Sequence, residues 1–193
     1  MKSVCVFCGS SSGSNPIFAE IATQVGKEIA RRQLCLVYGG GGIGLMGVVA
    51  DAALSAGGEV IGVIPQALLD KELGHGSLTE LVVVGSMHER KATMANRADA
   101  FLALPGGFGT FEEFCEVLTW AQLGLHNKPC GLLNVNGFYD PLLALFDRSV
   151  ADGFLRPKHR SLVLTGVSPS EILDGLANFV PIVLEKWIDP GKS

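Results

Sequence analysis

The sequence predicts an α/β protein with about seven strands in a doubly wound, Rossmann-like parallel sheet and helices on both faces. Three observations favour this class. Short apolar runs that end at glycine or proline recur along the chain, segments with helical spacing of apolar residues separate them, and 48% of the residues are hydrophobic while 18% are charged. Apolar runs without alternation are typical of strands buried on both faces, and their alternation with helices indicates parallel βαβ units.

The first half of the chain begins this alternation. The first predicted strand is KSVCVFC, residues 2–8, and the next segment carries apolar residues at the spacing of a helix stripe: Ile17, Phe18, Ile21, Val25 and Ile29. Asn15 and Pro16 fit the N-cap and the first turn of that helix. A strand over 34–38, a helix over 45–56 and a strand over 59–65 follow.

The second half continues the pattern with strands over 81–84, 100–104, 130–133 and 162–164, and with helices near 87–98, 110–124, 139–152 and 169–179. A chain of 193 residues suits one domain, which we expect to span residues 1–193. Ligands bind beyond the carboxyl ends of the strands in such sheets. We therefore expect the site in the loops after these strand ends: Cys8, Tyr38, Ile64, Val84 and Leu104.

Composition and charge disfavour several classes of function. The formal charge is −4 and no cluster of Lys and Arg is longer than a pair, so we expect no nucleic-acid or membrane partner. The apolar run at the N-terminus is too short for a signal peptide or a membrane span. Five cysteines, an odd number, favour a reducing cytoplasm. Cys5 and Cys8 form a C-x-x-C on opposite faces of a strand without a second pair, so we expect no metal site.

The first glycine-rich loop, YGGGGIGLMG, contains G-x-G-x-x-G at Gly39, Gly41 and Gly44. Such a loop can place backbone N–H groups against a phosphate, or it can make a tight turn with close packing. A dinucleotide site would have this loop after the first strand, but here it follows the second, and Glu59 opens the third strand instead of closing the second. An NAD(P)-dependent redox enzyme is therefore a disfavoured alternative. A P-loop is disfavoured more firmly, because no glycine of this loop is followed by Lys-Ser or Lys-Thr.

The second glycine-rich loop is in LPGGFGTFEE, residues 104–113. Gly106, Gly107 and Gly109 follow Pro105 and leave backbone N–H groups uncovered at a helix start, which suits a phosphate monoester. Thr110-x-x-Glu113 also fits a capping box, in which both side chains only satisfy the helix start. The spacing alone leaves both interpretations open.

The stretch SMHERK, residues 86–91, is a second helix start with the capping box Ser86-x-x-Glu89. Arg90 and Lys91 lie in its first turn, where the helix dipole opposes cations unless an anion is near. They either form a solvated basic turn or face the same cleft as the Gly106 loop, because consecutive strands usually lie close together.

Taken together, M-H-x-R-K at 87–91 and P-G-G-x-G-T-x-x-E at 105–113 closely resemble the Lonely Guy family of cytokinin riboside 5′-monophosphate phosphoribohydrolases. YGGGGIGLMG, GGEVIGVIP and TWAQLGLHNKPCGLLN extend the resemblance over roughly residues 2–165. Many proteins with the second motif carry the label lysine decarboxylase. The sequence gives that label no chemical support, since a pyridoxal-phosphate decarboxylase needs a Schiff-base lysine with an acidic partner for the pyridine nitrogen.

The resemblance implies hydrolysis of the N-glycosidic bond of N6-substituted adenosine 5′-monophosphates, or of AMP, to the free base and ribose 5-phosphate. Glu113 and Arg90 match the catalytic residues of the family. The matching also implies a homodimer that packs through helices near the active site and needs no cofactor or metal. The residues that it implies for nucleotide binding are Glu72, Lys91, Gly106, Gly107, Phe108, Gly109, Thr110, Glu112 and Thr119. The alternative is a non-catalytic nucleotide or cofactor carrier of the same fold, in which Glu113 would be only a cap.

Overall fold

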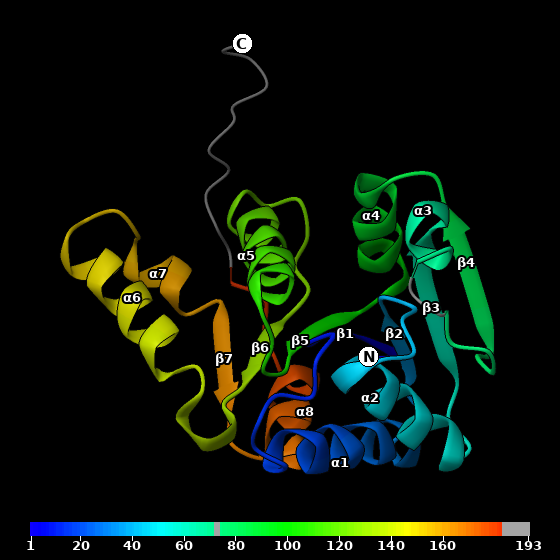
Figure 1. The fold of residues 1–193 in the computed structure, drawn as a ribbon. Helices are drawn as coiled ribbons and strands as arrows, with labels where there is room; N and C mark the ends of the chain where they lie inside the picture. Colours follow the sequence, from blue (N-terminus) through cyan, green and yellow to red (C-terminus); the bar gives the residue numbers. More distant parts are fainter. Residues whose placement is uncertain (72–73, 183–193) are drawn as a thin grey trace.

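Seven parallel strands form one sheet in the computed structural model, which describes residues 1–71 and 74–182 (Figure 1). The predicted fold class is confirmed. The strand order is β4-β3-β2-β1-β5-β6-β7, and every pair of neighbours is parallel. The strands are β1 (Ser3–Phe7), β2 (Cys35–Tyr38), β3 (Val60–Pro65), β4 (Glu80–Val84), β5 (Ala100–Ala103), β6 (Cys130–Leu133) and β7 (Val163–Gly166).

Helices cover both faces of the sheet. The longer ones are α1 (Ile17–Arg31), α2 (Gly44–Ser55), α4 (Met87–Arg97), α5 (Phe108–Gln122), α6 (Asp140–Ala151) and α8 (Pro169–Ala177). In Figure 1, α1, α2 and α8 lie below the sheet, and α4 and α5 lie above it. Two apolar clusters fill the space between the layers, one formed with α1, α2 and α8 and the other with α4 and α5.

Three short elements were not predicted: α3 (Gln66–Leu69), the 3₁₀ turn η1 (Val135–Gly137) and α7 (Pro157–Arg160). Each has only three or four residues, which is too short to show a helical period in the sequence. Helix α1 begins one residue later than predicted: Pro16 and not Asn15 is its N-cap, and the Asn15 carboxamide accepts a hydrogen bond of 3.1 Å from the Ile17 N–H. Within the described ranges, no helix has the length and hydropathy needed to cross a membrane.

The strand order reverses between β1 and β5, which makes their carboxyl ends the topological switch point of the sheet. The loops after these strands are tied together there, because the Gly9 N–H donates a hydrogen bond of 3.1 Å to the Pro105 carbonyl. The buried Tyr139 hydroxyl donates to the neighbouring Leu104 carbonyl at 2.6 Å. Backbone and side-chain bonds therefore fix the start of the Gly106 loop at the place where this fold binds ligands.

Candidate active site

Arg90 occupies the centre of the site as a buried cation. Its helix, α4, starts with the predicted cap: the Ser86 hydroxyl accepts a hydrogen bond of 3.1 Å from the Glu89 N–H. The Glu89 carboxylate accepts from the Gly85 N–H instead of the Ser86 N–H that a full capping box would use. The helix start places Arg90 over the carboxyl ends of β2 and β3, with 9% of the residue exposed.

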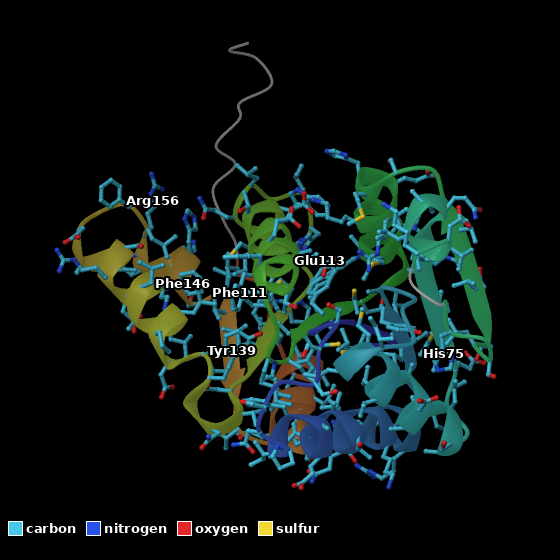
Figure 2. The ribbon with its side chains drawn as sticks, in the orientation of Figure 1. His75, Phe111, Glu113, Tyr139, Phe146 and Arg156 are labelled. Atoms are coloured by element: carbon cyan, nitrogen blue, oxygen red, sulfur yellow. The ribbon has the colours of Figure 1, made fainter. Side chains whose placement is uncertain are left out.

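Glu113 is the acidic partner of Arg90. Arg90 Nη1 and Glu113 Oε1 are 3.5 Å apart, and both side chains are largely buried. Glu113 projects from α5 on the side that faces α4 (Figure 2). Burial raises the pKa of the Glu113 carboxyl above its ordinary value, the Arg90 cation opposes that shift, and the neighbouring Glu112 carboxylate adds to it. A carboxyl group with a raised pKa is suited to proton transfer near neutral pH.

The capping-box interpretation of Thr110 and Glu113 is wrong. Helix α5 begins two residues before Thr110, with Gly107 as its N-cap and no side-chain cap. Thr110 is thus a buried residue inside the first turn, and Glu113 lies in the second turn, beyond the reach of a cap. The first N–H groups of α5 are consequently not satisfied by the side chains that the capping box would supply.

The two glycine-rich loops differ in what surrounds them. A methyl group on Gly39 would overlap Arg90 Nη2, and one on Gly44, whose φ is +60°, would overlap the Ser10 backbone. By contrast, among residues 1–71 and 74–182, no atom beyond the adjoining backbone lies within 4 Å of the position of a methyl group on Gly107 or Gly109. Protein atoms therefore fill the space beside the first loop, which supports the close-packing interpretation, whereas the second loop faces open space.

A cavity of about 290 Å³ lies at the open start of α5. This volume is near the lower end of the range for small-molecule sites. Its lining combines the Arg90–Glu113 pair with the start of α5, the β1–α1 loop and two apolar side chains, and consists of Cys8, Gly9, Ser10, Met46, Leu68, Arg90, Gly107, Phe108, Gly109, Thr110 and Glu113.

Sequence reasoning did not single out Met46 and Leu68 as site residues. Both are apolar residues of helical segments, and such residues are indistinguishable in sequence from core residues. The loop after Cys8 was expected to carry ligand contacts, and Cys8 does line the cavity. Burial raises the pKa of its thiol far above the ordinary value, so Cys8 is an uncharged group there and not a nucleophile.

Gly106 belongs to the loop but not to this cavity. It lines a neighbouring cavity of about 300 Å³ that also contains Phe18 and Phe138. A methyl group on Gly106 would overlap the Thr110 hydroxyl and lie 2.9 Å from the Gly9 nitrogen. Gly106 therefore permits the close packing of the loop, whereas Gly107 and Gly109 line the cavity of about 290 Å³.

Lys91 lies next to the cavity but faces α5. Its ammonium binds the Glu112 carboxylate at 2.6 Å and the Glu116 carboxylate at 2.9 Å. The hydrogen bond with Glu112 raises the pKa of Lys91 and keeps it charged. Neither Lys91 nor Glu112 lines the cavity of about 290 Å³. The predicted Glu72 lies outside the described residues.

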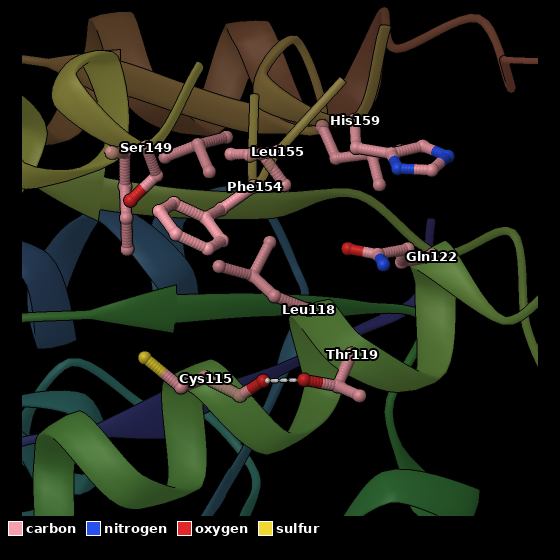
Figure 3. A pocket seen from close by; sticks show the side chains of 11 residues that line it. Cys115, Leu118, Thr119, Gln122, Ser149, Phe154, Leu155 and His159 are labelled. Atoms are coloured by element: carbon pink, nitrogen blue, oxygen red, sulfur yellow. Dashed lines mark hydrogen bonds between the residues drawn. The ribbon is translucent and has the colours of Figure 1, made fainter. Parts of the chain in front are cut away.

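Thr119 lies farther along α5, in a different hollow. Its hydroxyl donates a hydrogen bond of 2.7 Å to the Cys115 carbonyl. It is one of the residues that line a groove of about 260 Å³, together with Leu118 and Gln122 of α5 and with Phe154 and His159 (Figure 3). In one chain, therefore, Thr119 is separate from the Arg90–Glu113 cavity.

Comparison with curated proteins finds close relatives. The family model described as "Possible lysine decarboxylase" matches residues 46–176. A probable cytokinin riboside 5′-monophosphate phosphoribohydrolase of Oryza sativa subsp. japonica is 54% identical over 94% of this chain and 80% of its own length. A cytokinin riboside 5′-monophosphate phosphoribohydrolase of Arabidopsis thaliana is 50% identical over 94% of this chain and 79% of its own length.

Solved structures share the fold at lower identity. The molybdenum cofactor carrier protein of Chlamydomonas reinhardtii matches with a TM-score of 0.68 and 20% identity over 91% of this chain and 96% of that one. The molybdenum cofactor binding protein of Rippkaea orientalis matches with a TM-score of 0.67 and 22% identity over 90% and 94%. At such identities the likeness shows a common fold and not a common ligand.

Proposed function

This chain belongs to the family of cytokinin riboside 5′-monophosphate phosphoribohydrolases, and we propose that its activity resides in the cavity around Arg90 and Glu113. As a member of that family it hydrolyses the N-glycosidic bond of a cytokinin nucleotide and releases the free base and ribose 5-phosphate. The observation that carries the assignment of the site is a buried carboxyl–guanidinium pair beside the open start of a helix.

The start of α5 binds the 5′-phosphate in this proposal. The N–H groups of Phe108, Gly109 and Thr110 have no intrahelical acceptor, and the positive end of the helix dipole lies behind them. Among the described residues, the Thr110 hydroxyl has no hydrogen-bond partner, so it can donate to a phosphate oxygen. The open space beside Gly107 and Gly109 lets the phosphate approach the backbone.

Glu113 acts at the ribose. Hydrolysis breaks the bond between C1′ and the base nitrogen and joins the water oxygen to C1′ through an oxocarbenium-like transition state. A carboxylate at this place accepts a proton from the attacking water and stabilises the positive charge that develops on the sugar. The alternative of a non-catalytic carrier, in which Glu113 is only a cap, loses support because Glu113 caps no helix.

Arg90 orients Glu113 and binds the departing base. Its Nη1 group lies 3.5 Å from the Glu113 carboxylate, and both residues line the cavity. Arginine is a poor proton donor near neutral pH, so its part is electrostatic: a fixed positive charge stabilises the electron pair that the base takes from the broken bond.

A substrate comparison tests this assignment. We expect purified protein to release isopentenyladenine and ribose 5-phosphate from N6-isopentenyladenosine 5′-monophosphate. The same nucleoside without phosphate should react with kcat/KM lower by at least about a hundredfold, because it lacks the group that the start of α5 binds. The turnover of AMP, which has no N6 substituent, shows whether that substituent is needed for the reaction. Equal turnover of the nucleoside and the nucleotide would contradict the phosphate assignment.

We further propose that the protein acts in the cytoplasm as a homodimer of one-domain chains. Large apolar side chains are exposed at the groove of Figure 3: Phe154, which lines it, is 88% accessible, and Leu145, next to the lining residue Phe146 on α6, is 59% accessible. A second copy packed against this face would cover them and would also contact Thr119.

Light scattering coupled to size exclusion tests the dimer. We expect a mass of about twice the 20.3 kDa of the chain. Phe154→Ser and Leu145→Ser together should shift the protein toward the monomer, whereas Val167→Ser, at a residue 68% exposed elsewhere, should not. A wild-type mass of one chain would contradict the dimer, and an unchanged mass of the double variant would contradict the assigned face.

A further inference from the structure

Arg90 is held by backbone carbonyl groups as well as by Glu113. Its Nε donates a hydrogen bond of 3.0 Å to the Val63 carbonyl, and its Nη2 donates one of 3.0 Å to the Gly39 carbonyl. Nη1 is left for the Glu113 carboxylate at 3.5 Å and the Met87 sulfur at 3.9 Å. The two carbonyl bonds therefore determine which edge of the guanidinium faces the cavity.

These carbonyl groups are accessible because β2 and β3 separate at their carboxyl ends. The register of the two strands extends only to Tyr38 opposite Gly62. Val63 and Gly39 come directly after this last pair, so their carbonyl groups lie past the end of the ladder. The guanidinium takes the place of further ladder bonds and satisfies polar groups that burial would otherwise leave unpaired.

The absence of a side chain at Gly39 makes the contact possible. A methyl group there would overlap Arg90 Nη2, lie 3.1 Å from Arg90 Cζ and lie 3.3 Å from the Met46 sulfur. The backbone of Gly39 does not require glycine, because its φ is not in the left-handed region, unlike that of Gly40 at +78°. Contact with Arg90 is thus the reason for glycine at this position.

We propose that Gly39 is a positioning residue for the reaction: its missing Cβ lets the Arg90 guanidinium bind the Gly39 carbonyl, which keeps Nη1 directed at Glu113. This inference rests on the proposed role of Arg90 in catalysis. It also gives the G-x-G-x-x-G pattern of the first loop a function other than phosphate binding, since its first glycine serves an arginine of the chain itself.

Four proteins test the proposal: the wild type, Gly39→Ala, Arg90→Ala and the double variant. Gly39→Ala should fold, because the overlapping atoms are the end of a long side chain that can move. Its kcat should fall by at least about tenfold, since small displacements of catalytic groups have large effects on rate. KM should change by less than about threefold, because the start of α5 still binds the phosphate.

A double-mutant cycle on thermal stability makes the test independent of activity. Gly39→Ala should lower the Tm of the wild type, whose Arg90 must give up a carbonyl bond, but should not lower the Tm of Arg90→Ala, where the methyl group enters vacated space. Gly175→Ala in α8, with open space around the added methyl group, is the matched control and should leave kcat unchanged.

Equal loss of Tm from Gly39→Ala in both backgrounds would overturn the proposal, and so would wild-type kcat in Gly39→Ala. Failure of the proposed function gives a different result: Arg90→Ala would then keep its activity. The stability cycle would in that case still decide whether Gly39 and Arg90 are coupled.

Discussion

The Glu113 carboxyl group is subject to opposing influences. Burial raises its pKa, the Arg90 cation opposes the shift, and Glu112 supports it; the net direction is upward. A group shifted this way accepts a proton more readily at neutral pH than an exposed glutamate does. The same shift means that ionisation of Glu113 lowers the free energy of unfolding of the protein.

The pH dependence of activity should report the raised pKa of Glu113. As the pH is lowered, we expect kcat/KM to begin to fall at a pH above about 4.3, which is the pKa of an ordinary glutamate. Glu112→Gln should move this limb to lower pH, because it removes a carboxylate that raises the pKa of Glu113. Glu20→Gln, at an exposed position of α1, should leave the limb in place. A limb that does not respond to Glu112→Gln would contradict this account of the pKa.

The same group should give stability a measurable pH dependence. Between the ordinary and the raised pKa the native state binds more protons than the unfolded state, so the contribution of Glu113 to stability falls as pH rises through this window. The Tm of the wild type minus that of Glu113→Gln should therefore fall as pH rises above about 4.3, the ordinary pKa of a glutamate, by about 2–4 °C for each kcal/mol. A difference that is constant or increases with pH would show that the pKa is not raised.

At the scale of elements, the start of α5 distinguishes a structural helix cap from a ligand site. The capping-box pattern at Thr110 and Glu113 presumes that protein side chains satisfy the first N–H groups. In the structure the helix starts at Phe108 and leaves these groups without side-chain caps, beside the cavity. The local pattern was therefore insufficient to locate the helix start, because a ligand can satisfy the same donors.

Gly109→Ala separates binding from stability at this helix start. The added methyl group meets no protein atom within 4 Å and projects into open space at the cavity. Alanine is a better helix former, so we expect stability to be unchanged or to rise by about 0.5 kcal/mol. KM for the nucleotide should rise by about tenfold or more, since the methyl group takes space that the phosphate needs. Denaturant unfolding and steady-state kinetics measure the two effects.

Gly175→Ala is the matched control for this substitution, because α8 lies away from the cavity and its added methyl group also meets no atom within 4 Å. It should raise stability similarly and leave KM unchanged. An unchanged KM in Gly109→Ala would mean that the phosphate binds elsewhere.

Most elements of the sheet could be predicted from sequence because each strand is a short apolar run with a breaker after it. Arg90 and Glu113 could be predicted because the two motifs that contain them resemble a known family. The carbonyl groups that hold Arg90 could not, since backbone contacts between a helix and two strand ends leave no residue pattern. The family resemblance predicts Lys91 in the substrate site, but its two carboxylate partners, Glu112 and Glu116, are 21 and 25 positions away in the sequence. Local rules cover only separations of three or four positions.

At the scale of the whole molecule, the sheet topology brings Arg90 and Glu113 together. Helix α4 precedes β5 in the chain and α5 follows it. Arg90 and Glu113 therefore come from the helices on either side of one strand in the sequence. That strand pairs with β1 at the switch point, where the β1–α1 loop closes the cavity from the other side. The arrangement joins the helix start that we propose binds the phosphate with the Arg90–Glu113 pair, although the two are separate in the sequence.

Replacement of Glu113 by glutamine tests the central claim most directly. Release of isopentenyladenine from its ribonucleotide should be measured for the wild type and Glu113→Gln at neutral pH, with near-UV circular dichroism to confirm the fold. We expect kcat to fall by at least about a hundredfold while the fold is retained. A folded Glu113→Gln variant with the turnover of the wild type would contradict the assignment of Glu113 as the catalytic carboxylate.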